Sequence, residues 1–201
     1  MKDNYQNLSA MWQNMFRNMP NKEEKAAALG IPVENNSIHI TYYSRQYLLD
    51  FITGDIISLS ENSEIPFWDK MFIYHLFWYS SDSPLASKEY IPFQDIPGTK
   101  VFYAAFQKSI PPFTTHFNGR IDAFCNACEN LGGIKIPYGD AGYSIPIWGN
   151  LYLQIIFWDG DDEFPASATI LFDKNICQFT HPETVVIIGD DGIRAVLDAD
   201  T

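Results

Sequence analysis

The chain has 201 residues, of which 46% are hydrophobic and 19% are charged, so it is long and apolar enough to bury a sizeable core. Thirteen lysines and arginines stand against 25 aspartates and glutamates, and the net charge of −12 repels nucleic-acid phosphates. Three cysteines fit no disulfide framework, and no apolar stretch resembles a secretory signal or a membrane span. We therefore expect a cytoplasmic protein that binds neither nucleic acid nor membrane.

The first sixty residues divide into a helical part and a strand part. Apolar side chains recur at helical spacing near the start, and a Lys-Glu-Glu-Lys-Ala-Ala-Ala-Leu run ends at Gly30, which predicts two short helices within residues 1–30. Over residues 37–59 the apolar side chains alternate, and turn residues interrupt them twice. This pattern predicts a three-stranded antiparallel meander.

The middle of the chain is expected to be mainly helical. Residues 67–79 are aromatic and apolar on nearly every face, which predicts a helix packed on several sides. Prolines within residues 90–98 favour extended, irregular backbone over a long central strand. A short helix is expected over residues 101–108 and a clearer one over residues 118–131, for which Asn118 is a candidate N-cap.

The last third returns to strands. Residues 134–172 predict a β-rich part, in which residues 151–158 are apolar on both faces, as in an interior strand. In residues 183–197 a β-branched run lies next to Gly-Asp-Asp-Gly, and periodicity leaves helix and strand open. The chain thus predicts a single α+β domain over residues 1–201, with an antiparallel or mixed sheet packed on a central aromatic helix.

Three stretches of the chain together resemble a known family. They are residues 75–98, a Leu-Gly-Gly motif followed by Gly139-Asp140, and residues 158–173, which begin Trp-Asp-Gly-Asp-Asp-Glu-Phe-Pro and are the most specific. From about Trp12 to Ile188 the chain resembles the domain of unknown function 3786 family of mainly anaerobic bacteria and archaea. Some members resemble fusions to a corrinoid iron–sulfur protein type domain, which implies a link to anaerobic one-carbon metabolism. With three cysteines, this chain lacks that domain's cysteine quartet.

The acidic loop over residues 159–163 crowds four carboxylates into five positions. Carboxylate oxygens suit hard divalent cations, so Asp159, Asp161 and Glu163 are candidate metal ligands. The spacing fails the EF-hand template, and the alternative is a solvated, charged loop that keeps a strand edge from pairing. A metal-dependent or carboxylate-based hydrolase centred on Asp161, Glu163 and Asp140 is the enzymatic hypothesis.

Histidine and cysteine side chains offer two further candidate sites. His75 lies within the aromatic helix, where an imidazole could ligate a divalent metal or a corrinoid-like tetrapyrrole. The alternative is a hydrogen-bonded core histidine. Cys125 and Cys128 form a C-x-x-C pair, but both fall on the apolar stripe of their predicted helix. This position favours core packing over redox or metal chemistry.

Aromatic residues make up 15% of the chain, and large planar side chains line pockets for flat ligands as well as cores. Three loops combine aromatic residues with Ser, Gly and Asp, as the mouths of binding sites do. The candidate ligand-binding residues are His75, Trp78, Ser81, Asp140, Tyr143, Trp158 and Glu163.

The chain contains no G-x-S-x-G elbow, glycine-rich phosphate loop or H-E-x-x-H motif. The leading hypothesis is therefore a non-enzymatic cytoplasmic binding or accessory module. Its ligand would be a small molecule such as a corrinoid-like cofactor, or a partner protein of anaerobic one-carbon metabolism.

Overall fold

Two helices and a small antiparallel sheet form the N-terminal part of the computed structural model, which describes residues 2–60 and 64–200. The helices are α1 (Lys2–Arg17) and α2 (Lys22–Ala28), and the strands are β1 (Ser37–Tyr42), β2 (Arg45–Asp50) and β3 (Ile56–Ser58). The strands pair in the order β1-β2-β3. In β1, Ile38, Ile40 and Tyr42 are buried and the residues between them are more exposed, which confirms the alternation on which the meander was predicted.

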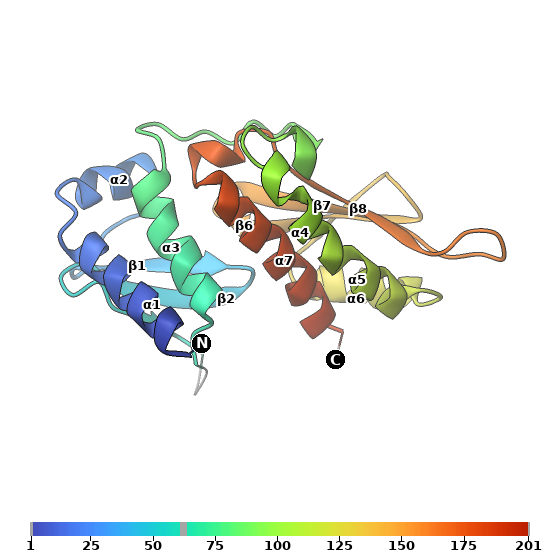
Figure 1. Cartoon of the computed structure of the whole chain (residues 1–201), viewed down its shortest axis with the longest axis horizontal. Coiled ribbons are helices and arrows are strands. Elements are labelled where there is room, and N and C mark those ends of the chain that lie inside the picture. Colours follow the sequence, from blue (N-terminus) through green and yellow to red (C-terminus); the bar gives the residue numbers. More distant parts are fainter. Residues whose placement is uncertain (1, 61–63, 201) are drawn as a thin grey trace.

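The aromatic helix is α3 (Phe67–Tyr79), with the bounds that the sequence predicted. It lies over the small sheet, between α1 on one side and α7 (Pro182–Asp198) on the other (Figure 1). Phe72 stacks on Tyr42 of β1 with ring centroids 4.0 Å apart, and Phe77 contacts Phe16 of α1 at 5.1 Å. Because neighbours cover several sides of α3, apolar residues occur on nearly every face of it.

A second sheet of five strands follows, in the order β4-β8-β7-β6-β5. Its strands are β4 (Tyr90–Pro92), β5 (Ile134–Ile136), β6 (Ala141–Trp148), β7 (Leu151–Trp158) and β8 (Ser167–Asp173). All the described strand pairs are antiparallel. β7 is the central strand, which explains its apolar residues on both faces. Residues 90–92 form a short edge strand, where Pro92 costs no interior ladder hydrogen bond.

Four helices cover one face of this sheet: α4 (Tyr103–Phe106), α5 (Ile110–Phe117), α6 (Ile121–Asn130) and α7 (Figure 1). One continuous cluster of buried apolar side chains extends from the first sheet to the second. The α+β fold expected from the sequence is confirmed, with the small sheet under α3 and the large sheet under α7. None of the described helices combines the length and the apolar character needed to cross a membrane.

The segment that the sequence left open is helical, because α7 runs through residues 183–197. Its two internal glycines serve close packing. A Cβ atom on Gly189 would collide with the ring of Phe106, and one on Gly192 would lie 2.5 Å from Cδ2 of Leu153. Glycine is needed here because neighbouring side chains touch the helix backbone, and it does not break the helix.

Two helix predictions need correction. The helix predicted over residues 118–131 begins at Ile121, and Asn118 instead follows the end of α5. The helix predicted over residues 101–108 is a four-residue helix between two 3-10 turns. No helix was predicted where α5 lies; its first turn contains two prolines, which are compatible with the start of a helix.

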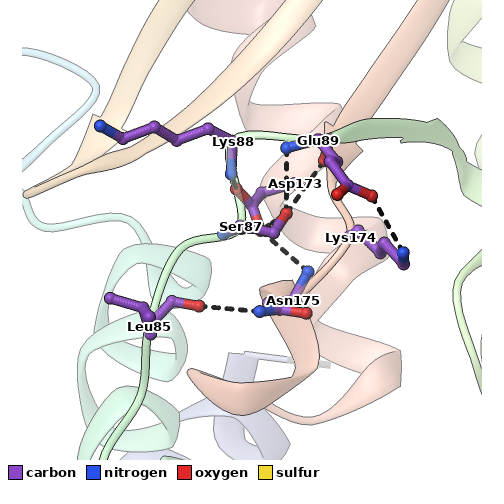
Figure 2. A network of polar contacts seen from close by, with 7 residues as sticks. All are labelled: Leu85, Ser87, Lys88, Glu89, Asp173, Lys174 and Asn175. Carbon is purple, nitrogen blue, oxygen red and sulfur yellow. Dashed lines mark hydrogen bonds and ion pairs between the residues drawn. The ribbon is translucent and has the colours of Figure 1, made fainter.

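Asp173, the last residue of β8, holds the connection between α3 and β4 onto the sheet (Figure 2). Its buried carboxylate accepts hydrogen bonds from the amides of Ser87, Lys88 and Asn175 and from the hydroxyl of Ser87, at 2.8 to 3.0 Å. Lys88 adopts a left-handed φ of 61° at this point. One carboxylate therefore orders a loop that has little secondary structure of its own.

We predict that Asp173→Ala lowers the free energy of unfolding by about 3 kcal/mol, because it leaves several partly buried donors without an acceptor. Urea unfolding measures the change. The matched control is Glu89→Gln, which weakens the nearby ion pair to Lys174, whose side chains are 69% and 55% exposed. We expect less than about 0.5 kcal/mol for the control. Equal effects of the two substitutions would contradict the role assigned to Asp173.

Candidate functional site

The seven residues predicted to bind a ligand fall into three separate places. The C-terminal end of α3 and the residues just after it hold His75, Trp78 and Ser81. The β7–β8 hairpin and its neighbourhood, at the other end of the molecule, hold Asp140, Trp158 and Glu163 (Figure 1). Tyr143 is buried in β6 and donates a hydrogen bond to Glu129 of α6 at 2.8 Å. These residues therefore do not line one common pocket.

The acidic loop forms hydrogen bonds with its own backbone. Oδ1 of Asp161 accepts from the amides of Phe164 and Glu163 at 2.7 and 2.8 Å, and these bonds lower the pKa of Asp161. Oδ2 of Asp140 accepts from the amide of Asp159 at 2.8 Å. Across residues 2–60 and 64–200, no three His, Cys, Asp or Glu side chains come together as metal ligands would. The geometry thus supports a charged hairpin loop more than a cation site.

His75 is packed within the helix layer. Its Nδ1 atom lies 2.7 Å from Oγ1 of Thr184 in α7, and its ring lies edge-on to Trp12 and Tyr79 at 4.4 and 5.2 Å. Nε2 is buried and has no hydrogen-bond partner among the described residues. Burial, with the proximity of His181, lowers the pKa of His75 to about 4. A tetrapyrrole needs an open face beside its axial ligand, so these surroundings do not fit that group and support a core histidine.

The cysteine pair lies on α6. Cys128 is buried, and burial raises the pKa of its thiol, while Cys125 is half-buried. A protonated thiol is a poor nucleophile and a poor metal ligand. The surroundings of the pair therefore support core packing.

A groove that sequence reasoning did not find runs along α7, between α3 and α4, with a volume of about 280 Å³. Its apolar lining comprises Val186 and Ile187 of α7, Trp68 of α3, and Phe102 just before α4. Lining residues extend from position 183 to 194 of α7, a helical length of roughly 16 Å. They share one helix face, a pattern that only a helical reading of this segment could have indicated.

Four charged side chains of α7 line this groove: Glu183, Asp190, Asp191 and Arg194. Nη1 of Arg194 lies 3.2 Å from Oδ1 of Asp191. Oδ1 of Asp190 accepts a hydrogen bond from the hydroxyl of Ser109 at 2.5 Å. Three carboxylates stand against one guanidinium, so the groove attracts cations.

A buried polar network lies beneath the groove. Asp191 is 1% exposed, and its Oδ2 accepts a hydrogen bond from Tyr42 of β1 at 2.9 Å. Asp69 of α3 is fully buried, pairs with Nε of Arg45 at 2.8 Å and accepts a hydrogen bond from Tyr47. Burial, together with repulsion from Asp69, raises the pKa of Asp191 to about 6. An aspartate that titrates near neutral pH in a cavity is a functional-site candidate.

We predict that His75 stays neutral above about pH 4, so its ring resonances should titrate far below those of an ordinary histidine. His75 binds its proton more tightly in the unfolded chain than in the folded protein. Its contribution therefore lowers the free energy of unfolding as the pH falls from about 6.5 to 4. His75→Gln should remove this pH dependence and lower the free energy of unfolding at pH 7.5 by about 1–3 kcal/mol. NMR titration and urea unfolding measure both effects, and a midpoint of 6 or higher would contradict the packing described.

For Asp191 we predict a pH dependence of stability with the opposite sign. Its pKa in the folded protein lies above the ordinary value of 3.8, so the folded state binds this proton more tightly and gains stability as the pH falls from about 6 to 4. The stability of the wild type minus that of Asp191→Asn should rise by about 2–3 kcal/mol across this range.

The control for Asp191 is Asp161→Asn on the exposed hairpin, where the pKa of the carboxyl is lowered and the difference should have the reverse sign. Urea titrations at pH 7.5 and at several values down to pH 4 give both differences. A difference for Asp191→Asn that does not change with pH would contradict a charged, buried carboxylate at neutral pH.

Comparison with known proteins identifies a family and nothing more specific. A family model described as Domain of unknown function (DUF3786) matches residues 21–195. No curated protein and no solved structure matches the chain. The matched range contains the groove, the buried network, His75 and the acidic hairpin. The chain therefore belongs to the DUF3786 family.

Proposed function

We propose that this protein is a non-enzymatic accessory module that docks a helical segment of a partner protein along its helix layer. The observation that carries the proposal is the groove on α7, whose lining includes the aliphatic side chains of Val186 and Ile187 and the aromatic side chains of Trp68 and Phe102. Grooves of this kind bind amphipathic helices through apolar side chains spaced by one and two helical turns. Along roughly 16 Å, the groove could receive anchors at positions i, i+4 and i+7 of such a helix.

Exposed aromatic side chains extend this surface from the groove across α3 to α1. We call them the aromatic strip: Tyr5, Trp68, Trp78 and Tyr79, each between 39% and 41% exposed. Ring contacts form two groups among them: Tyr5 lies 6.0 Å from Trp68, and the half-buried Trp12 lies 6.0 Å from both Trp78 and Tyr79. Exposed apolar clusters mark interaction surfaces, and tryptophan and tyrosine are the residues that most often anchor them.

The size of the groove supports a peptide more than a large cofactor. Its volume of about 280 Å³ is just below the range for sites that enclose a small molecule, which hold about 300–1,000 Å³. A few side chains of a partner would fill it. We extend the proposal to a cytoplasmic location, which the three free cysteines support.

The test uses the full chain and a fluorescent 15-residue helical peptide with leucines at positions i, i+4 and i+7 and uncharged residues elsewhere. Fluorescence anisotropy should show saturable binding, and Trp68→Ala should weaken it about tenfold, because an exposed tryptophan beside the groove would anchor the peptide. The matched control is Trp158→Ala. Trp158 is also 39% exposed, but it is the last residue of β7, away from the groove.

We expect the Trp158→Ala control to bind the peptide as the wild type does, with circular dichroism confirming that both variants are folded. Absence of saturable binding would refute the proposed function. Equal losses of affinity in the two tryptophan variants would refute it as well.

A further inference from the structure

The charges in the groove point to the chemistry of the docked segment. Glu183 is exposed, and its carboxylate has no hydrogen bond or ion pair within the described residues. Asp190 is half-buried and Asp191 is buried, and both line the same groove. Since Arg194 is the one cationic side chain in the lining, the groove carries an excess of negative charge.

Arg194 satisfies Asp191 only in part. Oδ2 of Asp191 accepts the hydrogen bond from Tyr42, and Oδ1 is the oxygen that pairs with a cation, Arg194. The single contact from Nη1 of Arg194 is 3.2 Å long, whereas charge-assisted hydrogen bonds are about 2.7–2.9 Å long. The side chain of Arg194 is also 51% exposed, while that of Asp191 is 1% exposed. The geometry is that of a fixed carboxylate with a replaceable cation.

The aromatic lining of the groove suits a guanidinium or an ammonium group as well. Trp68 lines the same groove as these carboxylates, and indole rings attract cations. A second copy of this chain is a poor occupant, because two chains of charge −12 repel each other. A basic partner would instead be attracted over a long range.

We infer that the groove recognises an amphipathic helix that carries an arginine or a lysine, and that Arg194 occupies the place of this residue in the free protein. The inference rests on the proposed function and adds the charge of the partner. On docking, the basic residue of the partner binds the carboxylates of Asp191 and Asp190, Arg194 turns to solvent, and the apolar side chains of the helix cover Val186 and Ile187.

The test compares three versions of the leucine peptide that differ only at two flanking positions, which hold arginine, glutamine or glutamate. The arginine peptide should bind the wild type about tenfold more tightly than the glutamine peptide, and the glutamate peptide should bind more weakly than either. The double variant Glu183→Gln, Asp190→Asn should reduce the preference for arginine over glutamine at least threefold. Arg194→Gln should increase the affinity for the arginine peptide, because it frees Oδ1 of Asp191.

The matched control is the double variant Asp161→Asn, Glu163→Gln, which removes the same charge from the hairpin and should leave the preference for arginine unchanged. If the glutamine peptide binds as tightly as the arginine peptide while Trp68→Ala weakens both, the inference is overturned and the proposed function stands. If Trp68→Ala weakens neither peptide, both fail. A loss of affinity for the arginine peptide in Arg194→Gln would also overturn the inference, since Arg194 would then assist the partner.

Discussion

Two buried carboxylates, on Asp69 of α3 and Asp191 of α7, set the arrangement of the helix layer. A carboxylate away from water is costly unless it is paired, and each of the two has at least one partner in the small sheet. Tyr42 reaches Asp191, while Arg45 and Tyr47 reach Asp69. Because Tyr42 and Arg45 are directly paired across β1 and β2, the sheet fixes the separation of the two helices.

The groove follows from this arrangement. Asp191 accepts the hydrogen bond from Tyr42 through Oδ2 and pairs through Oδ1 with the half-exposed Arg194, which lines the groove together with Trp68 and α4. Close packing on the inner face holds α7 in place, since Gly189 lies against Phe106. The buried network and the candidate docking surface therefore share one helix, α7. A substitution in the network should for this reason also alter the groove.

Sequence patterns predicted those parts of the fold that depend on local periodicity. The aromatic run predicted α3 with correct bounds, and the alternation predicted the meander. In α7, the sequence Gly-Asp-Asp-Gly resembles a helix breaker, so the segment could not be assigned and its groove was missed. The structure shows why glycine occurs there: Phe106 packs against Gly189, and Leu153 packs against Gly192. Thr184, the partner of His75, lies 109 residues further along the chain, which no local pattern reveals. The acidic hairpin was conspicuous in the sequence, but the carboxylates of Asp159 and Asp161 accept hydrogen bonds from backbone amides.

The docking surface that we propose is the groove on α7. The most direct test is to record ¹H–¹⁵N spectra of the full chain during titration with the arginine peptide. We expect saturable shifts of the Trp68 indole and of amides within residues 183–194, with the hairpin over residues 158–165 unaffected. Shifts concentrated in that hairpin, or no saturable shifts along α7, would contradict the claim.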